Sequence, residues 1–448
     1  MLSPTDAQER AQALIARAKR AGADAADVVY IADSSESVAV RLGKLEDVER
    51  SESEHIGLRV FVGHRSASIG STDLGDAALD ELAGRAVDMA RLAPEDPYAG
   101  LAPQDRLLKG VLRDLDLAEP GEPSPKALRD LAEAAEDAAR AVAGVTNSEG
   151  AGASAGQAVL ALATSHGFAG AYCGTSRSIS ASVVAGEGST MQRDYAWRTA
   201  RHGGDLPSAQ EIGQMAGDRA VARLNPGKLK SGQMPVVFDP RIGGSFIGHL
   251  AGAISGSSIA RRSSFLLDKL DAQLFDSAIT ITDDPLRLRG LRSRPFDGEG
   301  LPTAAHDLVV GGKITGWLMD SASARQLGLA PTGHASRGAS GAPGVAPSNL
   351  HMGAGSLSPA ELMADIADGV YITELIGHGV NGVTGDYSRG ASGYRIVGGQ
   401  LAGPVAEFTI AGNLVDMFAA LTPANDLEWH RSINVPTIRI DGMMIAGD

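Results

Sequence analysis

The sequence predicts an α+β fold with an N-terminal α+β unit, a middle α+β domain and a C-terminal strand-rich domain whose sheet is mainly antiparallel. A chain of 448 residues is long enough for two or three domains, each with its own core. It holds 56 glycines but only 19 aromatics, namely 9 Phe, 7 Tyr and 3 Trp. This balance indicates many turns and close backbone contacts rather than a bulky core. Short alternating segments recur between amphipathic helical ones.

The predicted N-terminal domain spans residues 1–112. Its first helix begins after Ser3, which is a helix-capping residue, and has Pro4 in its first turn and Asp6 at the third position. This helix is expected to end near Ala21. Alternating apolar and polar residues then predict strands of an antiparallel sheet, and a second helix closes the unit. The strands are expected at residues 26–33, 37–42, 55–63 and 65–71, and the helix at 76–92.

The predicted middle domain spans residues 113–228. A helix begins at Ser124-Pro125 and is expected to reach about Ala143. Strands are predicted at 159–164 and 178–185. The sequence from Ser208 to Glu211 matches a capping box and predicts another helix that ends near Leu224.

The predicted C-terminal domain spans residues 229–448 and begins with an apolar strand at 234–238. Two Gly-Gly pairs, in LVVGGKITGWLM and YRIVGGQLAG, predict hairpins. A short helix is expected after Ser358-Pro359, and a last strand at 437–445. The loop at 332–349 is too long and too poor in large side chains to form a core, so it is expected to be functional or disordered.

One stretch, GGSFIGHLAGAISGSSIA at residues 243–260, has no charged residue and places a glycine at every fourth position: Gly244, Gly248, Gly252 and Gly256. Glycines with this spacing occur at contacts between transmembrane helices. Four serines, a histidine and many helix-weakening glycines argue against a membrane span here. The sequence therefore predicts a buried helix on whose glycine face another backbone packs closely.

Composition and charge exclude several functional classes. The net charge of −14 argues against direct nucleic-acid binding, because a phosphate backbone would be repelled. The single cysteine, Cys173, excludes an intramolecular disulfide and a multi-cysteine metal site. The N-terminus lacks the basic and apolar regions of a signal peptide. We therefore expect a cytoplasmic protein without membrane contact.

A formal GxGxxG pattern is formed by Gly377, Gly379 and Gly382 directly after a predicted strand. A dinucleotide site requires a helix next, because the helix N-terminus holds the pyrophosphate. The following VTGDYSRGASGY cannot begin a helix. A glycine-rich connection between strands is the better interpretation.

Two constellations could carry hydrolytic chemistry in this chain. His378, Asp386 and Ser388 could form a triad, although no serine lies in a GxSxG elbow, and a structural histidine is the favoured interpretation. Asp297 and Glu299 in SRPFDGEGLPT are spaced as paired carboxylates on one strand face. The favoured interpretation of this pair is a turn whose acids cap backbone amides.

Four motifs in order, GGSFIGHLAGAISG, SRPFDGEGLPT, GHGVNGVTGDYSRGASGY and EFTIAGNLVDMF, resemble the TldD/PmbA family, and within it the PmbA/TldE branch. The resemblance extends over essentially the whole chain. It implies a heterodimer with a TldD-like protein that acts as a zinc metallopeptidase on peptides and unfolded segments. The family's older label, modulator of DNA gyrase, does not imply DNA contact.

In the TldD branch the helix at this position carries HExxxH, which supplies two zinc ligands and a glutamate base. The matching positions in this chain are Gly248, His249 and Ala253, and NDLEWHRSINVPT near the C-terminus has no cysteine. The resemblance therefore implies a subunit without zinc that shapes the substrate chamber, with zinc in its partner. The alternatives are an independent hydrolase that uses His378 and Asp386 or Asp297 and Glu299, and a non-enzymatic assembly protein.

Overall fold

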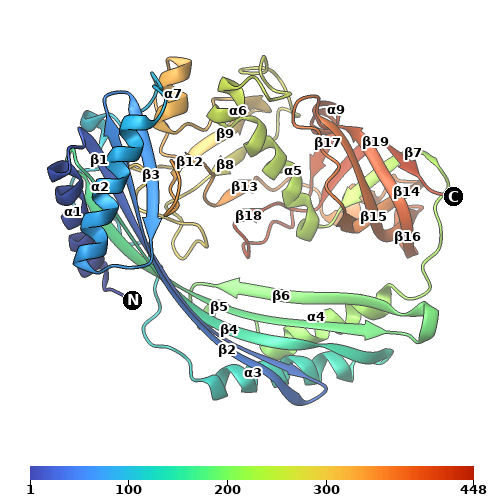
Figure 1. The fold of residues 1–448 in the computed structure, drawn as a ribbon. Coiled ribbons are helices and arrows are strands. Elements are labelled where there is room, and N and C mark those ends of the chain that lie inside the picture. The colour runs from blue at the N-terminus through green and yellow to red at the C-terminus, as the bar shows by residue number, and fades with distance from the viewer.

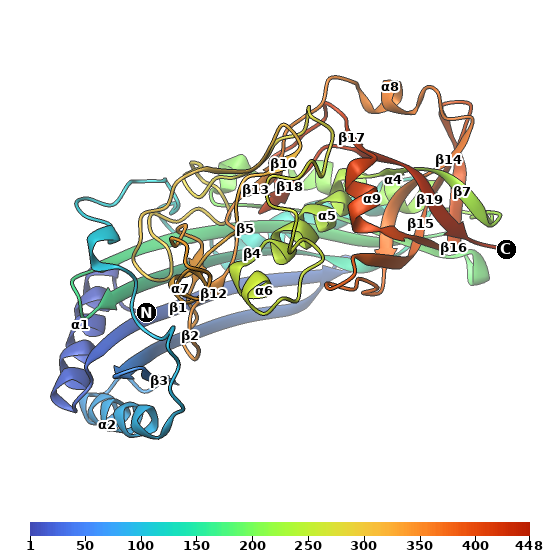
Figure 2. The same ribbon diagram turned by 90° about the horizontal axis from the view of Figure 1, so that it is seen from above.

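The computed structural model describes residues 1–448 and confirms the α+β class. A long curved sheet carries helices on its outer face and holds the C-terminal domain on its inner side (Figure 1). Seen from above, the long strands extend beneath the C-terminal domain over most of the length of the molecule (Figure 2). None of the helices combines the length and the apolar composition that a membrane-spanning helix requires.

The curved sheet is entirely antiparallel, in the order β3-β2-β1-β4-β5-β6, so that β3 and β6 are its edges. Its strands are β1 (Ala25–Arg41), β2 (Lys44–Val62), β3 (Arg65–Ser71), β4 (Val145–Thr164), β5 (Ala169–Ala185) and β6 (Gln192–Ala200).

The strands are longer than the sequence predicts, and they cross the predicted boundary at residue 112. The two segments expected at 26–33 and 37–42 form one strand, β1, because β2 and β4 hydrogen-bond to it on both sides through the polar Ser34 and Ser35. The charged half of β2 and the small-residue half of β4 lack an alternation of apolar and polar residues, so no sequence pattern predicts them as strands. The pairing of β1 with β4 joins the first two predicted domains in a single sheet.

Four helices cover the outer face of this sheet: α1 (Pro4–Arg20), α2 (Asp76–Leu92), α3 (Pro125–Ala141) and α4 (Ala209–Ala222). The predicted starts of α1, α3 and α4 are confirmed, because the side chains of Ser3, Ser124 and Ser208 accept backbone hydrogen bonds at the first turns. A Cβ atom at Gly213 or Gly217 of α4 would overlap α3, so these glycines permit close helix packing. The expected close backbone contacts are therefore present.

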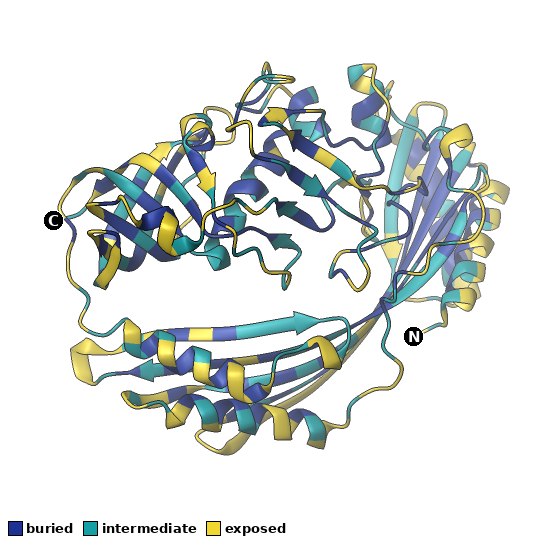
Figure 3. Cartoon of the chain, turned by 180° about the vertical axis from the view of Figure 1, so that it is seen from behind, coloured by how far each residue is buried: buried dark blue, intermediate teal, exposed yellow.

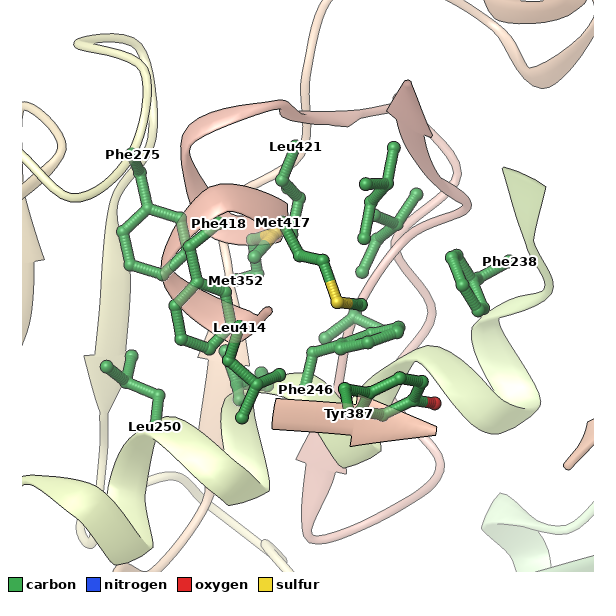
Figure 4. Close-up of a cluster of buried hydrophobic side chains, with 14 of the residues drawn as sticks. Phe238, Phe246, Leu250, Phe275, Met352, Tyr387, Leu414, Met417, Phe418 and Leu421 are labelled. Atoms are coloured by element: carbon green, nitrogen blue, oxygen red, sulfur yellow. The ribbon is translucent and has the colours of Figure 1, made fainter. Parts of the chain in front are cut away.

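The largest core lies in the C-terminal domain, around a mainly antiparallel sheet in the order β16-β15-β14-β7-β19-β17. β16 also pairs with β19, which closes the sheet on itself, and only β7 and β14 are parallel. Figure 4 shows Phe238, Phe246, Tyr387 and Leu414 among the buried side chains of this core. The strands are β7 (Gly232–Phe238), β14 (Asp368–Ile376), β15 (Asp386–Val397), β16 (Gln400–Asn413), β17 (Leu421–Pro423) and β19 (Ile438–Ala446).

A second, five-stranded sheet lies between the closed sheet and the long curved one (Figure 1). Both predicted Gly-Gly hairpins are confirmed, since the glycine pairs 311–312 and 398–399 have positive φ angles in the turns. The small strands are β8 (Ile281–Asp283), β9 (His306–Val310), β10 (Lys313–Ile314), β11 (Ala335–Ser336), β12 (Gly344–Val345), β13 (Leu350–Met352) and β18 (Ile433–Asn434). The remaining helices are α5 (Pro240–Ala253), α6 (Gly256–Ala260), α7 (Ser321–Leu327), α8 (Pro359–Met363) and α9 (Leu414–Ala419).

Buried charges connect the curved sheet to the C-terminal domain. Asp27 on β1 accepts a 2.7 Å hydrogen bond from Arg59 Nε on β2 and a 2.9 Å bond from Arg337 Nη2 in the C-terminal domain. These three residues are at most 7% exposed. Beside them, Phe296 makes edge contacts with the rings of Phe168 and Tyr172 at 4.9 and 5.4 Å. Figure 3 shows that this end of the sheet is rich in buried residues.

The loop at 332–349, expected to be functional or disordered, is docked on the curved sheet. It forms the short pair β11–β12 and contributes the buried Arg337. A Cβ atom at Gly57 would overlap the carbonyl of Ala339, and one at Gly70 would lie 3.0 Å from the same oxygen. Gly57 and Gly70 are register partners on β2 and β3, so they leave room for the loop.

Removal of the Asp27 carboxylate is expected to weaken the connection between the two parts of the molecule. Asp27→Ala leaves two buried guanidinium groups without their partner, so we expect a loss of about 3–5 kcal/mol in the free energy of unfolding. Urea unfolding measures this loss. Asp33→Ala, at an exposed position on the same strand without an ion pair, is the matched control. Equal stability of the two variants would contradict the prediction.

Candidate functional site

Helix α5 carries the residues that match the catalytic helix of the resembled family. Asp239 caps the helix by accepting a 2.8 Å hydrogen bond from the amide of Arg241, and Pro240 occupies the first turn. Phe246 and Leu250 face the core (Figure 4), while small residues occupy much of the opposite face. Packing on one side thus fixes which residues of α5 line the cavities on the other.

The expected close packing along the whole glycine face is wrong. α5 ends at Ala253, and Gly256 belongs to the separate helix α6. A Cβ atom at Gly244 would lie 3.3 Å from Ile433 Cγ2, whereas one at Gly252 would meet no atom within 4 Å. The face is open at Gly252 because it borders a cavity, which the sequence pattern could not show.

A cavity of about 350 Å³ borders the second half of α5. It is lined by Gly248, His249 and Ala253 from the helix, together with His378 and Arg389. The Nε2 atom of His249 is buried and has no hydrogen-bond partner. Burial and the charge of Arg389 lower the pKa of His249, so this imidazole is neutral at pH 7.

The residues of this cavity do not match a zinc site. Gly248 and Ala253 have no side-chain donor atom, and the positively charged Arg389 lines the same cavity as His249. Catalytic zinc takes three protein ligands, usually imidazole, carboxylate or thiolate. Nowhere in residues 1–448 do three or more His, Cys, Asp or Glu side chains form a group that could hold a metal ion.

His378 and Asp386 do not form a triad with Ser388. The Asp386 carboxylate accepts hydrogen bonds from Thr384 and Asn413, at 2.6 and 3.3 Å, and none from His378. The glycine-rich segment around His378 connects β14 to β15 without a helix, as the sequence predicts.

Asp297 and Glu299 lie in a buried turn and not on a strand. Asp297 Oδ1 accepts 2.9 Å hydrogen bonds from the amides of Glu299 and Leu301, and Glu299 Oε2 accepts a 2.8 Å bond from the amide of Ser321. Burial raises the pKa of both carboxyl groups, and the Asp297 charge helps to raise that of Glu299 to about 7. Glu299 Oε1 also lies 4.0 Å from Arg59, so the turn adjoins the buried charges that connect the two parts of the chain.

The largest feature near α5 is a basic cavity that the sequence analysis missed. Two hollows of about 390 and 670 Å³ lie between edge strand β6 and the C-terminal domain, and both are lined by Thr199 and Arg431. The larger hollow also shares Arg389 with the cavity at His249, so the two are continuous. We call the two hollows the arginine cavity. Its only carboxylates are Asp205 and Glu428. Its arginines are Arg198, Arg201, Arg241, Arg287, Arg289, Arg292, Arg389 and Arg431.

Aromatic rings and a neutral histidine complete the arginine cavity. The guanidinium of Arg287 lies 3.5 Å from the ring centroid of Trp429, and that of Arg431 lies 4.9 Å from that of Trp197. Burial and the charges of nearby arginines lower the pKa of His430 to about 4. His430 therefore stays neutral at pH 7 and adds no positive charge to that of the arginines.

Comparison with known proteins identifies the relatives of this chain. Three family models match it in order: PmbA/TldA metallopeptidase domain 1 at residues 26–90, the central domain at 118–224 and the C-terminal domain at 231–447. The chain is 39% identical to the metalloprotease PmbA of Escherichia coli O157:H7, covering 95% of this chain and 92% of that protein. A PmbA homologue from Haemophilus influenzae is 35% identical, with 96% and 94% covered.

Solved structures show the same architecture. A protein described as a modulator of DNA gyrase from Bacteroides thetaiotaomicron superposes with a TM-score of 0.91 over 100% of both chains, at 26% identity. TldE from Thermococcus kodakarensis superposes with a TM-score of 0.86 at 20% identity, covering 98% of this chain and 100% of that one. At the latter identity the likeness shows the fold alone.

Glycines 252 and 256 are expected to respond differently to a methyl group. A Cβ atom at Gly256 would lie 2.5 Å from Met319 Sδ and 3.0 Å from the Leu318 carbonyl, so Gly256→Ala should lower the free energy of unfolding by about 1–3 kcal/mol. Gly252→Ala adds its methyl to open space and should change it by less than about 1 kcal/mol. Urea unfolding of the two variants tests this difference, and equal losses would contradict it.

Ionisation of Glu299 is expected to reduce stability as the pH rises. Its folded pKa of about 7 exceeds the ordinary value of 4.5, so between these values the folded state keeps a proton that the unfolded state has lost. The contribution of Glu299 to the free energy of unfolding is therefore greatest below about pH 4.5. It falls by about 3 kcal/mol as the pH rises through 7.

Glu299→Gln removes this titration. Between pH 5 and pH 8 its free energy of unfolding should fall less than that of the wild type, as measured by urea unfolding. Glu187→Gln, at an exposed position without an ion pair, is the control and should follow the wild type. A Glu299→Gln variant with the wild-type pH dependence would refute the assignment.

Proposed function

The chain belongs to the PmbA/TldD metallopeptidase family, and we propose that it is the TldE-like subunit of a cytoplasmic two-chain zinc metallopeptidase that processes or degrades peptides and unfolded segments. In this proposal a TldD-like partner holds the zinc ion and the catalytic base. This chain completes the substrate chamber and does not cleave by itself.

The composition of α5 carries the proposal. Activation of water by zinc needs metal ligands and a base. The positions that match HExxxH are Gly248, His249 and Ala253, which together offer one imidazole. Arg389 lines the same cavity and repels a cation. A chain with this helix can be a subunit of a zinc metallopeptidase only if another subunit binds the zinc ion.

The arginine cavity supports a role in holding substrate. It lies along β6, which is an edge strand of the curved sheet and pairs only with β5. An edge strand can accept an extended peptide through backbone hydrogen bonds, and pockets beside it can take the side chains. The cavity also continues to α5, so a peptide held there would lie beside the helix that matches the family's catalytic helix.

An independent hydrolase is the alternative, and one observation favours it. The pKa of Glu299, raised to about 7, suits general acid–base catalysis near neutral pH. Glu299 is only 4% exposed, however, and its carboxylate is occupied by the amide of Ser321. A substrate would have to displace the docked turn to reach it. A purely structural assembly role has no specific observation in its favour.

Co-purification with the TldD-like protein from the same genome tests the proposal. We expect a complex with zinc and chelator-sensitive cleavage of an unstructured peptide, whereas this chain alone should hold no stoichiometric zinc and show no cleavage. Gly248→His, His249→Glu and Ala253→His together should not create a peptidase, because residues five apart on a helix point about 140° away from each other. Cleavage by the unmodified chain alone would support the independent hydrolase instead.

A further inference from the structure

Five residues of the arginine cavity have no carboxylate partner within the chain. Arg201, Arg287, Arg292, Arg389 and Arg431 form no ion pair within 4.0 Å. Arg201 instead donates to the backbone carbonyls of Gly290, Thr175 and Leu291. The Arg292 side chain makes no hydrogen bond, and Nε of Arg389 is buried without a partner.

Two other arginines at this junction have a structural role, because each forms an ion pair with a buried carboxylate. Arg241 and Arg223 share the buried carboxylate of Asp194, with N–O distances of 2.8 and 3.3 Å. A buried guanidinium stays charged, and its desolvation is unfavourable unless an anion compensates. Burial lowers the pKa of Arg201, Arg287 and Arg431, and no carboxylate of the chain pairs with any of the three.

The charge of the cavity is opposite to that of the whole molecule. The chain carries a net charge of −14, yet eight arginines and two carboxylates line this space. A recess lined with one sign of charge focuses its potential and raises the local concentration of ligands of the other sign. Trp197, Trp429 and Ile433 add apolar surface between the guanidinium groups, which suits a ligand that is not charged throughout.

We infer that the arginine cavity binds extended peptide segments rich in aspartate or glutamate, so that acidic unfolded segments are preferred substrates of the chamber. This inference rests on the proposed function and names its substrate class. Side-chain carboxylates accept two parallel hydrogen bonds from one guanidinium group, which gives geometric selectivity as well as attraction. A nucleic acid fits less well, because its phosphates continue beyond the cavity onto a surface of negative net charge.

Binding of a fluorescent peptide to the full isolated chain tests the inference. The probe is a short unstructured peptide of alternating Glu and Ser, acetylated and amidated at its ends, and the matched peptide has Gln at every Glu position. Fluorescence anisotropy should show at least about tenfold tighter binding of the Glu peptide, as expected when charge-assisted hydrogen bonds replace neutral ones. Added salt should weaken binding of the Glu peptide far more than that of the Gln peptide.

Variants of two arginines locate the binding site. Arg292→Gln and Arg389→Gln remove guanidinium groups without internal carboxylate partners, so each should weaken Glu-peptide binding by about threefold to tenfold while the thermal melt is unchanged. Arg85→Gln, on the outer helix α2 with a side chain 62% exposed, is the matched control and should bind like the wild type.

Several outcomes would overturn the inference. These are equal affinity for the Glu and Gln peptides, equal affinity of the two cavity variants and Arg85→Gln, or tighter binding of a single-stranded oligonucleotide than of the Glu peptide. A Gln peptide with a free C-terminal carboxylate that binds as tightly as the Glu peptide would assign the cavity to chain ends instead.

These measurements do not depend on the partner subunit, so the two proposals can fail separately. Charge-selective binding by a chain that forms no complex with the TldD-like protein would refute the proposed function and keep the inference. An active complex whose isolated subunit has no preference for acidic peptides would support the proposed function and refute the inference about acidic substrates.

Discussion

The buried contact of Asp27 with Arg59 and Arg337 is the constraint on which the rest of the structure depends. It joins the inner face of the curved sheet to the loop at 332–349, and Glu299 adjoins it. Breaking one member of such a network leaves a charge buried without compensation, so the contact fixes the relative position of its elements. The curved sheet is hydrogen-bonded continuously from β3 to β6, so the strand that carries this contact belongs to the same sheet as the edge strand that borders the arginine cavity.

Small residues make that contact possible. Gly57 and Gly70 let the backbone at Ala339 approach the sheet, and Gly213 and Gly217 let α4 approach α3. The chain is rich in glycine and poor in aromatic residues because backbones that approach each other closely along long strands leave no room for large side chains. The aromatic rings concentrate instead in the closed C-terminal sheet, in the contact around Phe296, and at the arginine cavity.

The two chemical features of the candidate site follow from this arrangement. α5 packs its large side chains into the C-terminal core and turns Gly248 and Gly252 toward the cavities, so the helix offers space rather than metal ligands. The arginine cavity fills the junction of β6 with the C-terminal domain, where segments from three parts of the chain meet. Both features agree with the proposed role of this chain, which is to form a wall of the substrate chamber and hold a peptide that the partner subunit cleaves.

The sequence by itself determined the local elements. Serine caps set the starts of α1, α3 and α4, Gly-Gly pairs set two hairpins, and ordered motifs indicated the family, because each of these signals acts within a few residues. Only the tertiary structure decided that β1 and β4 share one sheet, that Gly252 faces a cavity, and that arginines from Arg198 to Arg431 converge on one space. Residues so far apart in sequence leave no periodic pattern, and their proximity arises from long-range strand pairing and from burial of the Asp27 network.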